Sequence, residues 1–507
     1  MTKLASEATE SQPLIKKETP ESSGTAAAAI ADDIEARGSK SAAPTTKSTE
    51  TVLEDAIDIL KLAIPIFITS FSWVGKKTTD TGLLGHLSQE ALAASALSDL
   101  WTMTTSVLLS GRILGVLIGG AVGAGNPKLA GIYLQVSYVV LFATSVLVFV
   151  AWNLTEQVWL RFGSDPEISK MAGTYSTLLS FAIPGMIAFG QLSQYFSAQK
   201  IMYPEVYSSA VGLFANLAFG LIFVLGWPIP GFAGFGFEAC PIVTTSVTYV
   251  QLLFMVIVFV YIQKLHEPCW PGFKASEITW DRIKTFVELY FPAALSSSSD
   301  FWRVAVIGSM AASLGEADVA VFNTAYRIMW IALIFVVSIA GAAAINMSIR
   351  LGKRDPYGAR QAGHVSIGMV VIMLCILGFF ILLKNRWFGL IFTNDEEFLS
   401  LFQQCSVPFT ISLIFMNLSV AIERIPYSMG RTKEVFWMGF VASWGGQVPA
   451  VFILTTYWRN DLVGLYTGMA IGYFLLTILY SIIVIRSDWE KYAEIAQRRS
   501  ETLPNEK

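Results

Sequence analysis

The sequence of 507 residues has few charged side chains: Asp, Glu, Lys and Arg together make up 14% of it. A soluble protein typically has about 25%. Hydrophobic residues instead make up 54%, and they occur in runs of about twenty, the length at which a helix spans a bilayer. This composition excludes an ordinary soluble protein and predicts an all-α polytopic membrane protein. The net charge of −3 gives no basic field that would attract nucleic acid, so no such partner is expected.

Histidine and cysteine are also scarce. With only three histidines, a histidine proton relay is not expected. The four cysteines, Cys240, Cys269, Cys375 and Cys405, form no C-x-x-C pair, and we interpret them as packing residues without a metal or disulfide role. No soluble segment contains a G-x-S-x-G, H-E-x-x-H or P-loop motif. The sequence therefore predicts neither an enzyme nor an ATP-driven pump, and it predicts no cofactor.

The hydrophobic runs predict twelve transmembrane helices, arranged as two six-helix lobes. The expected spans are 60–85, 91–124, 131–152, 173–198, 206–227, 240–263, 285–313, 318–348, 365–392, 398–422, 435–457 and 462–485. The first lobe is expected over 51–264 and the second over 285–486, with an inter-lobe cytosolic loop over 265–284. Since six spans is an even number, the two lobes are parallel repeats, and a cavity is expected between them.

The two halves of the chain resemble each other at a fixed offset. Pro65 and Pro292 are 227 residues apart, and so are Lys76 and Arg303. A second stretch repeats at an offset of 224, which aligns Lys200 with Arg424. This duplication of a membrane bundle is typical of secondary transporters.

Both ends of the chain are expected to be cytosolic. Residues 1–50 are rich in Ser, Thr, Ala and Glu and predict a disordered cytosolic tail, and 487–507 predict a second tail. Basic residues concentrate in the loops that follow even-numbered spans, which places both termini inside. The segment Glu10–Ile15 fits an acidic dileucine signal for a sorting adaptor, so the plasma membrane and a vacuolar or endolysosomal membrane are both open. A monomer in contact with membrane lipid is expected.

The first span carries charge where a lipid-facing helix would have none. Charges inside a bilayer are costly, and they usually belong to a transport pathway or an ion site. Lys76 and Lys77 precede Asp80 by four and three residues, so both ammonium groups can reach its carboxylate across one helical turn. A nearby cation and burial shift the pKa of a carboxyl group in opposite directions, which would allow proton exchange at Asp80. A neutralised pair that lines a wet cavity remains the alternative.

The seventh span repeats this arrangement, with Asp300 three residues before Arg303. Trp302 could present a ring face to a cationic substrate, although packing is an open alternative. Asp99, Arg112 and Arg327 are expected to face the interior. Further candidates for the substrate cavity are Gln191 and Gln194. Glu423 and Arg424 are expected to form a salt-bridged gate or cap at the cytosolic end of the tenth span.

Several short motifs, in this order and spacing, resemble the multidrug and toxic compound extrusion (MATE) family. They are Leu62-Ala-Ile-Pro65, Asp80 with Gly85-His86-Leu87, Ala91-Leu-Ala-Ala94, Gly119-Gly-Ala-Val-Gly-Ala124, Leu129-Ala-Gly-Ile-Tyr-Leu-Gln135, Pro292 with Asp300, and Gly430-Arg-Thr-Lys433. The Gly-Ile-Tyr-Leu-Gln segment is similar to eukaryotic members. The resemblance covers about 55–490 and implies a V-shaped bundle that exports organic solutes in exchange for H⁺ or Na⁺.

The resemblance also implies roles for single residues. Asp80 and Asp300 match acids that the family uses for cation coupling, and Asn216 matches an Asn of the same site. Gly220 stands where the family pattern has a further acid. The tenth-span acid has no clear match.

These observations predict a secondary antiporter that exports organic solutes, with cations favoured as substrates. Protons are favoured over Na⁺ because Gly220 removes an oxygen ligand and hard cations prefer several. The intramembrane cations Lys76, Lys77, Arg112, Arg303 and Arg327 leave two alternatives open, an exporter of organic anions such as citrate and a flippase for lipid-linked saccharides. A non-transporting membrane receptor is the remaining class.

Overall fold

A computed structural model describes residues 51–501 except 110 and 112. Within this range the chain forms helices and connecting loops, with no strand. The expected tail over 1–50, the sorting signal at Glu10–Ile15 and Arg112 lie outside the described residues. The all-α prediction is confirmed.

Two long helices begin the two halves of the chain, α2 (Val52–Gly85) and α11 (Trp280–Ala312). The start of α2 is fixed by a capping box in which Thr51 and Glu54 exchange hydrogen bonds. Each helix contains the proline of the predicted repeat, Pro65 in α2 and Pro292 in α11.

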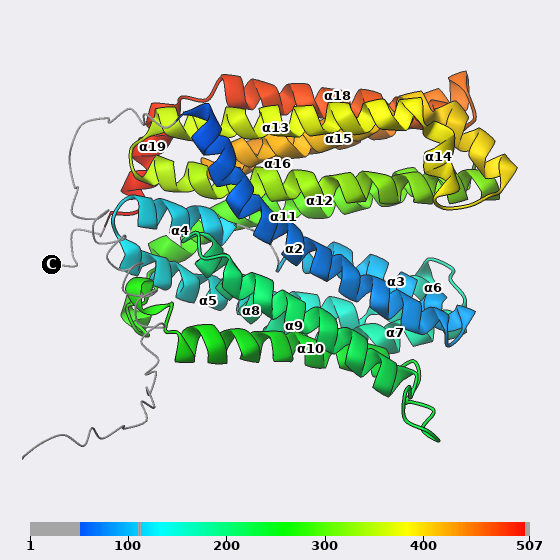
Figure 1. The fold of residues 1–507 in the computed structure, drawn as a ribbon, viewed down its shortest axis with the longest axis horizontal. Helices are drawn as coiled ribbons and strands as arrows, with labels where there is room; N and C mark the ends of the chain where they lie inside the picture. The colour runs from blue at the N-terminus through cyan, green and yellow to red at the C-terminus, as the bar shows by residue number, and fades with distance from the viewer. Residues whose placement is uncertain (1–50, 110, 112, 502–507) are drawn as a thin grey trace, which may run out of the picture.

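The remaining helices form two groups. The first group contains α3 (Gln89–Ser106), α4 (Ile113–Gly123), α5 (Pro127–Asn153), α6 (Thr155–Arg161), α7 (Pro166–Ser180), α8 (Ile183–Ser197), α9 (Tyr203–Phe219) and α10 (Ala239–Met255). The second contains α12 (Glu316–Gly352), α13 (Pro356–Leu383), α14 (Asn385–Leu390), α15 (Glu396–Ser428), α16 (Thr432–Phe440), α17 (Val448–Ile453), α18 (Leu462–Ile485) and α19 (Trp489–Arg498). We call these groups the first and second lobes (Figure 1).

Nine helices within the described residues are long and apolar enough to cross a membrane, and the number is ten if the bent pair α7–α8 is counted as one span. The segment expected as one span over 91–124 contains two helices, because α3 ends at Ser106 and α4 begins at Ile113. The span expected at 398–422 is also longer than predicted, since α15 continues to Ser428. The total of twelve spans stays a prediction.

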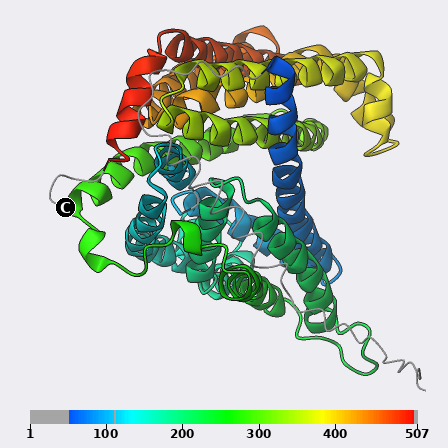
Figure 2. The ribbon, with the colours of Figure 1, turned by 60° about the vertical axis from the view of Figure 1, so that its left-hand side comes forward.

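Each lobe has its own buried core, and α2 and α11 contribute to both. The first half of α2 packs into the core of the second lobe through Ile59 and Ala63, whereas Leu84 near its end belongs to the core of the first lobe. In α11 the order is reversed: Tyr290 lies in the core of the first lobe and Ile307 in that of the second. Both views show α2 passing from one lobe to the other (Figures 1 and 2).

The lobes meet closely at one end of the bundle, which we call the α19 end. Here α4 packs against α12 through small residues: a Cβ added to Gly123 would meet the Ile349 carbonyl, and one added to Gly352 would meet Gly120. Glycine at these positions lets the two backbones approach. Asp55 of α2, which is 1% exposed, forms an ion pair with Arg350 of α12 and accepts a hydrogen bond from Gln361 of α13 at 2.8 Å.

The short helix α19 lies across this end and packs on α4, α12 and α13 (Figure 2). Two first-lobe side chains hold the residues that follow it. Tyr133 donates a hydrogen bond to the Arg499 carbonyl at 3.0 Å, and Asn126 donates one to the Ser500 carbonyl at 3.0 Å. On the second lobe, the Arg431 guanidinium lies 5.2 Å from the ring centre of Tyr492. The segment therefore connects the two lobes.

Candidate functional site

The carboxylate of Asp80 lies at the centre of a polar cluster inside the first lobe. Its side chain is 4% exposed. Asn216 of α9 donates a hydrogen bond to it at 2.9 Å, and Thr244 of α10 donates another at 3.0 Å. The structure thus brings together Asp80 and Asn216, as the family resemblance implied, and adds Thr244, for which no sequence motif gave a signal.

Gly220 supports this cluster by its lack of a side chain. It follows α9, and a Cβ at this position would collide with the Leu83 side chain of α2. The place of the additional family acid is therefore occupied by an apolar side chain. The close approach of α9 to α2 is what allows the Asn216 amide to reach the Asp80 carboxylate.

The two lysines form their hydrogen bonds elsewhere. The Lys76 ammonium donates to the Gln251 side chain at 2.7 Å, and the Lys77 ammonium forms an ion pair with Asp99 at 2.6 Å. Among the described residues neither lysine forms a hydrogen bond with Asp80, although the spacing along α2 would permit one. Both cations extend from α2 to neighbouring helices, because helices adjacent in space offer partners that the spacing along one helix does not reveal.

In the second lobe, Asp300 and Arg303 of α11 form the predicted ion pair, with 3.1 Å between the carboxylate and the guanidinium. Arg303 also donates to the Ser443 hydroxyl at 2.8 Å and lies over the ring of Tyr473 at 5.1 Å. Arg303 is buried, whereas 46% of the Asp300 side chain is exposed. The acid is accessible because it lines a cavity.

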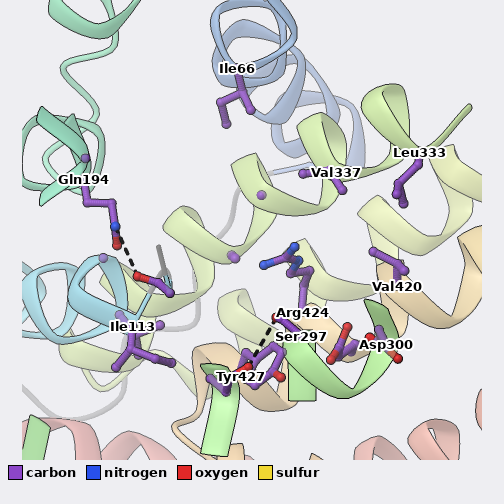
Figure 3. A pocket seen from close by; sticks show the side chains of 18 of the residues that line it. Ile66, Ile113, Gln194, Ser297, Asp300, Leu333, Val337, Val420, Arg424 and Tyr427 are labelled. Carbon is purple, nitrogen blue, oxygen red and sulfur yellow. Dashed lines mark hydrogen bonds between the residues drawn. The ribbon is translucent and has the colours of Figure 1, made fainter. Parts of the chain in front are cut away.

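This cavity has a volume of about 680 Å³ and lies between the lobes (Figure 3). Residues of α2, α4, α8 and α9 line it, together with residues of α11, α12, α15 and α18. Its walls are rich in aromatic rings: Trp73, Phe189, Phe301, Tyr326, Trp330, Tyr427, Tyr473 and Tyr480. The volume and lining suit a drug-sized organic ligand.

Four of the predicted site residues line the cavity, namely Asp300, Arg303, Gln191 and Gln194. Gln194 donates to the Gly111 carbonyl at 3.2 Å, and the side-chain carbonyl oxygens of Gln191 and Gln194 are buried without a hydrogen-bond partner among the described residues. Within the described part of the chain these two oxygens are acceptors without a donor.

The other predicted residues lie away from the lining of this cavity. They are Lys76, Lys77, Asp80, Asp99, Asn216, Trp302 and Arg327. Trp302 packs edge-on against Trp101, with ring centres 6.4 Å apart, and is partly exposed, so a role toward a cationic substrate stays a prediction. Arg327 is exposed on α12 and lies outside the cavity lining, so its orientation toward the interior stays a prediction. The sequence did not reveal on which side of α11 and α12 these residues lie.

Three charged residues of the cavity were not predicted as part of it. Glu423 and Arg424 lie within α15 and line the cavity, so they do not cap the end of that helix, and their role as a salt-bridged gate stays a prediction. Glu205 of α9 lines the opposite wall and accepts a hydrogen bond from Ser197 at 2.9 Å. The alignment of Lys200 with Arg424 in the repeat was the available signal for α15, but the helix was predicted to end too early.

The comparisons with known proteins agree with this arrangement. The protein-family model MatE matches residues 65–222 and 292–453. The chain is 24% identical to multidrug and toxin extrusion protein 1 of Xenopus tropicalis, over 89% of this chain and 77% of that protein. It is also 24% identical to the protein DETOXIFICATION 9 of Arabidopsis thaliana, over 87% of this chain and 91% of that protein.

A solved structure shares the fold. The crystal structure of the eukaryotic MATE transporter AtDTX14 superposes with a TM-score of 0.80 at 19% identity and covers 89% of this chain and 100% of that one. The family match spans both lobes and includes the parts of α2 and α11 that carry Asp80 and Asp300. The chain therefore belongs to the MatE family and is a multi-pass membrane transporter of the MATE type, not an enzyme.

Proposed function

We propose that this transporter is a proton-coupled antiporter that exports organic solutes by alternating access between its two lobes. The observation that carries the proposal is the placement of one acid in each lobe at repeat-related helices, Asp80 on α2 and Asp300 on α11. Each acid is held by a specific partner, Asn216 or Arg303. A coupling ion can drive transport only if it binds the two conformations with different affinity.

Protons fit the Asp80 cluster better than Na⁺. Both carboxylate oxygens of Asp80 already accept hydrogen bonds, from Asn216 and Thr244. A hard cation prefers several oxygen ligands, and Gly220 supplies no side-chain oxygen. Protonation would instead weaken the hydrogen bonds that the ionised carboxylate accepts, because charge-assisted bonds are the stronger ones.

A cationic group on the substrate is favoured by the cavity. Its aromatic walls can stabilise a cation through their ring faces, and the carboxylates of Glu205 and Glu423 line it. If the protein instead exported organic anions or flipped a lipid-linked saccharide, the arginines of the cavity would bind the anionic group of the substrate. We propose that the α19 end faces the cytosol, in the plasma membrane or a vacuolar membrane, as the distribution of basic residues predicts.

Transport into proteoliposomes tests the proposal. The purified protein is reconstituted, a pH gradient or a Na⁺ gradient is imposed, and uptake of cationic, anionic and saccharide solutes is measured. We expect uptake driven by the pH gradient, with loss of this uptake in Asp80→Asn and in Asp300→Asn. The matched control is Glu316→Gln, which neutralises an exposed acid at the start of α12 and should transport normally. Gradient-driven uptake that survives in both variants would overturn the coupling scheme.

A further inference from the structure

The α19 segment, which we define as residues 489–501, contacts the two lobes in different ways. It follows α18 of the second lobe directly in the chain. It also packs against the core of that lobe through four apolar side chains, namely Trp489, Tyr492, Ala493 and Ala496. Burial of apolar surface is the dominant stabilising term in folding. We therefore expect α19 to move together with α12 and α13, on which it packs.

The contacts with the first lobe are fewer and weaker. Tyr133 donates a hydrogen bond to the Arg499 carbonyl at 3.0 Å. Asn126 donates one to the Ser500 carbonyl, also at 3.0 Å. The side chain of Ser500 is 4% exposed and lies close to α4, since a Cβ added to Gly120 would be 3.7 Å from the Ser500 hydroxyl oxygen. A hydrogen bond between neutral groups changes an equilibrium by only about two- to tenfold.

These weak contacts lie where α4 and α12 meet. A Cβ added to Gly352 of α12 would collide with the backbone of Gly120, the same residue that lies beside Ser500. Opening of the α19 end has to separate α4 from α12. Because α19 packs on the second lobe, it would leave with α12, and its hydrogen bonds from Tyr133 and Asn126 would break. The apolar contacts of α19 with the second lobe would stay as they are.

We propose that the α19 segment is a latch, which binds the first lobe through Arg499 and Ser500 while the α19 end is closed and releases it whenever this end opens. The proposal rests on the proposed function, because it assumes that the α19 end opens during alternating access. Two neutral hydrogen bonds favour the closed form by about four- to hundredfold, which still permits release in every cycle. A helix that only completed the core of the second lobe would need no bond to the first.

Removal of the two first-lobe donors tests the latch without any substrate. Tyr133→Phe and Asn126→Ala are combined in the full-length protein, and the distance between spin labels across the α19 end is measured. The labels are attached to cysteines at the exposed positions Ser276, in the loop before α11, and Arg360, on α13. The exposed Cys375 is first replaced by serine. We expect the population with a longer distance to rise by about four- to hundredfold relative to the closed form.

A second readout separates a latch from a simple attachment of the chain end. The rate at which a maleimide labels Ser500→Cys reports release of the segment, because position 500 is buried. The double variant should show faster labelling together with the longer distance. Faster labelling with the wild-type distance overturns the proposal, because the contacts then only fix the end of the chain. Unchanged labelling and distance overturn it as well. Tyr138→Phe, which removes a similar bond within the first lobe, is the matched control and should change neither.

A reversible cross-link tests whether release is required for transport. Gly120→Cys and Ser500→Cys are combined in the Cys375→Ser protein, since the close approach of positions 120 and 500 suits a disulfide. Uptake of the cationic dye rhodamine 6G into proteoliposomes is measured under a pH gradient. We expect at least a tenfold loss of uptake on oxidation and recovery with a reductant. Ser500→Cys alone, oxidised in the same way, should transport normally. Full uptake by protein that mass spectrometry shows to be cross-linked overturns the proposal.

The two experiments separate the latch from the function on which it rests. Wild-type protein that moves no organic solute under any gradient contradicts the antiporter, and the spin-label distances then decide the latch. Wild-type and cross-linked proteins that transport equally well contradict only the latch.

Discussion

Asn216 of α9 donates its side-chain amide hydrogen to the Asp80 carboxylate of α2 at 2.9 Å, inside the first lobe and away from the cavity. The same amide lies 3.4 Å from the Lys76 carbonyl. One amide therefore links the acid to the backbone of its own helix one turn earlier. Any change in the protonation of Asp80 acts directly on the contact between α2 and α9.

Replacement of Asn216 tests the importance of this contact. Asn216→Leu leaves the buried carboxylate without one of its two hydrogen bonds, which should cost roughly 1.5–3 kcal/mol. We expect a lower melting temperature of the purified protein and a strongly reduced proton-driven flux. Asn346→Leu is a suitable control, because the side-chain nitrogen and oxygen of Asn346 are buried without hydrogen-bond partners among the described residues. A wild-type melting temperature in Asn216→Leu would contradict the prediction.

The ion pair between Lys77 and Asp99 should be coupled in a double-mutant cycle. Each side chain is 27% exposed, and the charges are 2.6 Å apart. Lys77→Met or Asp99→Asn alone leaves one charge without its partner and should destabilise the protein by roughly 1–3 kcal/mol. The double variant should lose less than the sum of the two, and thermal unfolding in detergent measures the difference. Strict additivity would show that the two groups contribute independently.

A side chain at Gly123 should separate the lobes at the α19 end. Gly123→Ala places a methyl group against the Ile349 carbonyl of α12, and two packed backbones cannot both stay in place. We expect a longer distance between spin labels near the starts of α5 and α13, and a lower melting temperature. Gly368→Ala should change neither quantity, because nothing lies within 4 Å of the added methyl group. An unchanged distance in Gly123→Ala would show that this end is not sealed by α4 and α12.

The backbone amides of the residues that follow α19 should exchange hydrogen with water faster when their hydrogen-bond partners in the first lobe are removed. Tyr133→Phe deletes the hydrogen bond to the Arg499 carbonyl. One lost bond of this kind should speed amide hydrogen exchange in 489–501 by up to about tenfold. Tyr138→Phe deletes a similar bond, to the Ala188 carbonyl at 3.1 Å, within the first lobe. It should leave exchange in 489–501 as it is in the wild type, and equal effects of the two variants would contradict the prediction.

Local spacing predicted the parts of the site that lie on one helix. Asp300 and Arg303 are three residues apart on α11 and form the expected ion pair. Lys77 and Asp99 could not be matched in this way, because they lie on different helices and the same spacing argument gave Asp80 as the partner. Motif order identified Asp80 and Asn216 together, but nothing in the sequence pointed to Thr244.

Hydropathy predicted the long helices well and their inner polar faces poorly. Glu423 and Arg424 interrupt the apolar pattern of α15, which suggested the end of a span. The helix continues past them to Ser428, because these side chains face a cavity and not lipid. A hydrophobicity profile cannot distinguish a charge at the membrane surface from one that faces a cavity between lobes.

The sharing of α2 between the two cores restricts how the protein can be assembled during synthesis. The chain is made from its N-terminus, so α2 enters the membrane long before α12 and α15 exist. Until then Ile59 and Ala63, which belong to the core of the second lobe in the folded protein, lack the second-lobe side chains against which they pack. The first lobe is likewise incomplete until Tyr290 of α11 has been made. The nascent protein therefore cannot finish one lobe before it begins the other, and α2 must reach its final position after the second half of the chain has been inserted.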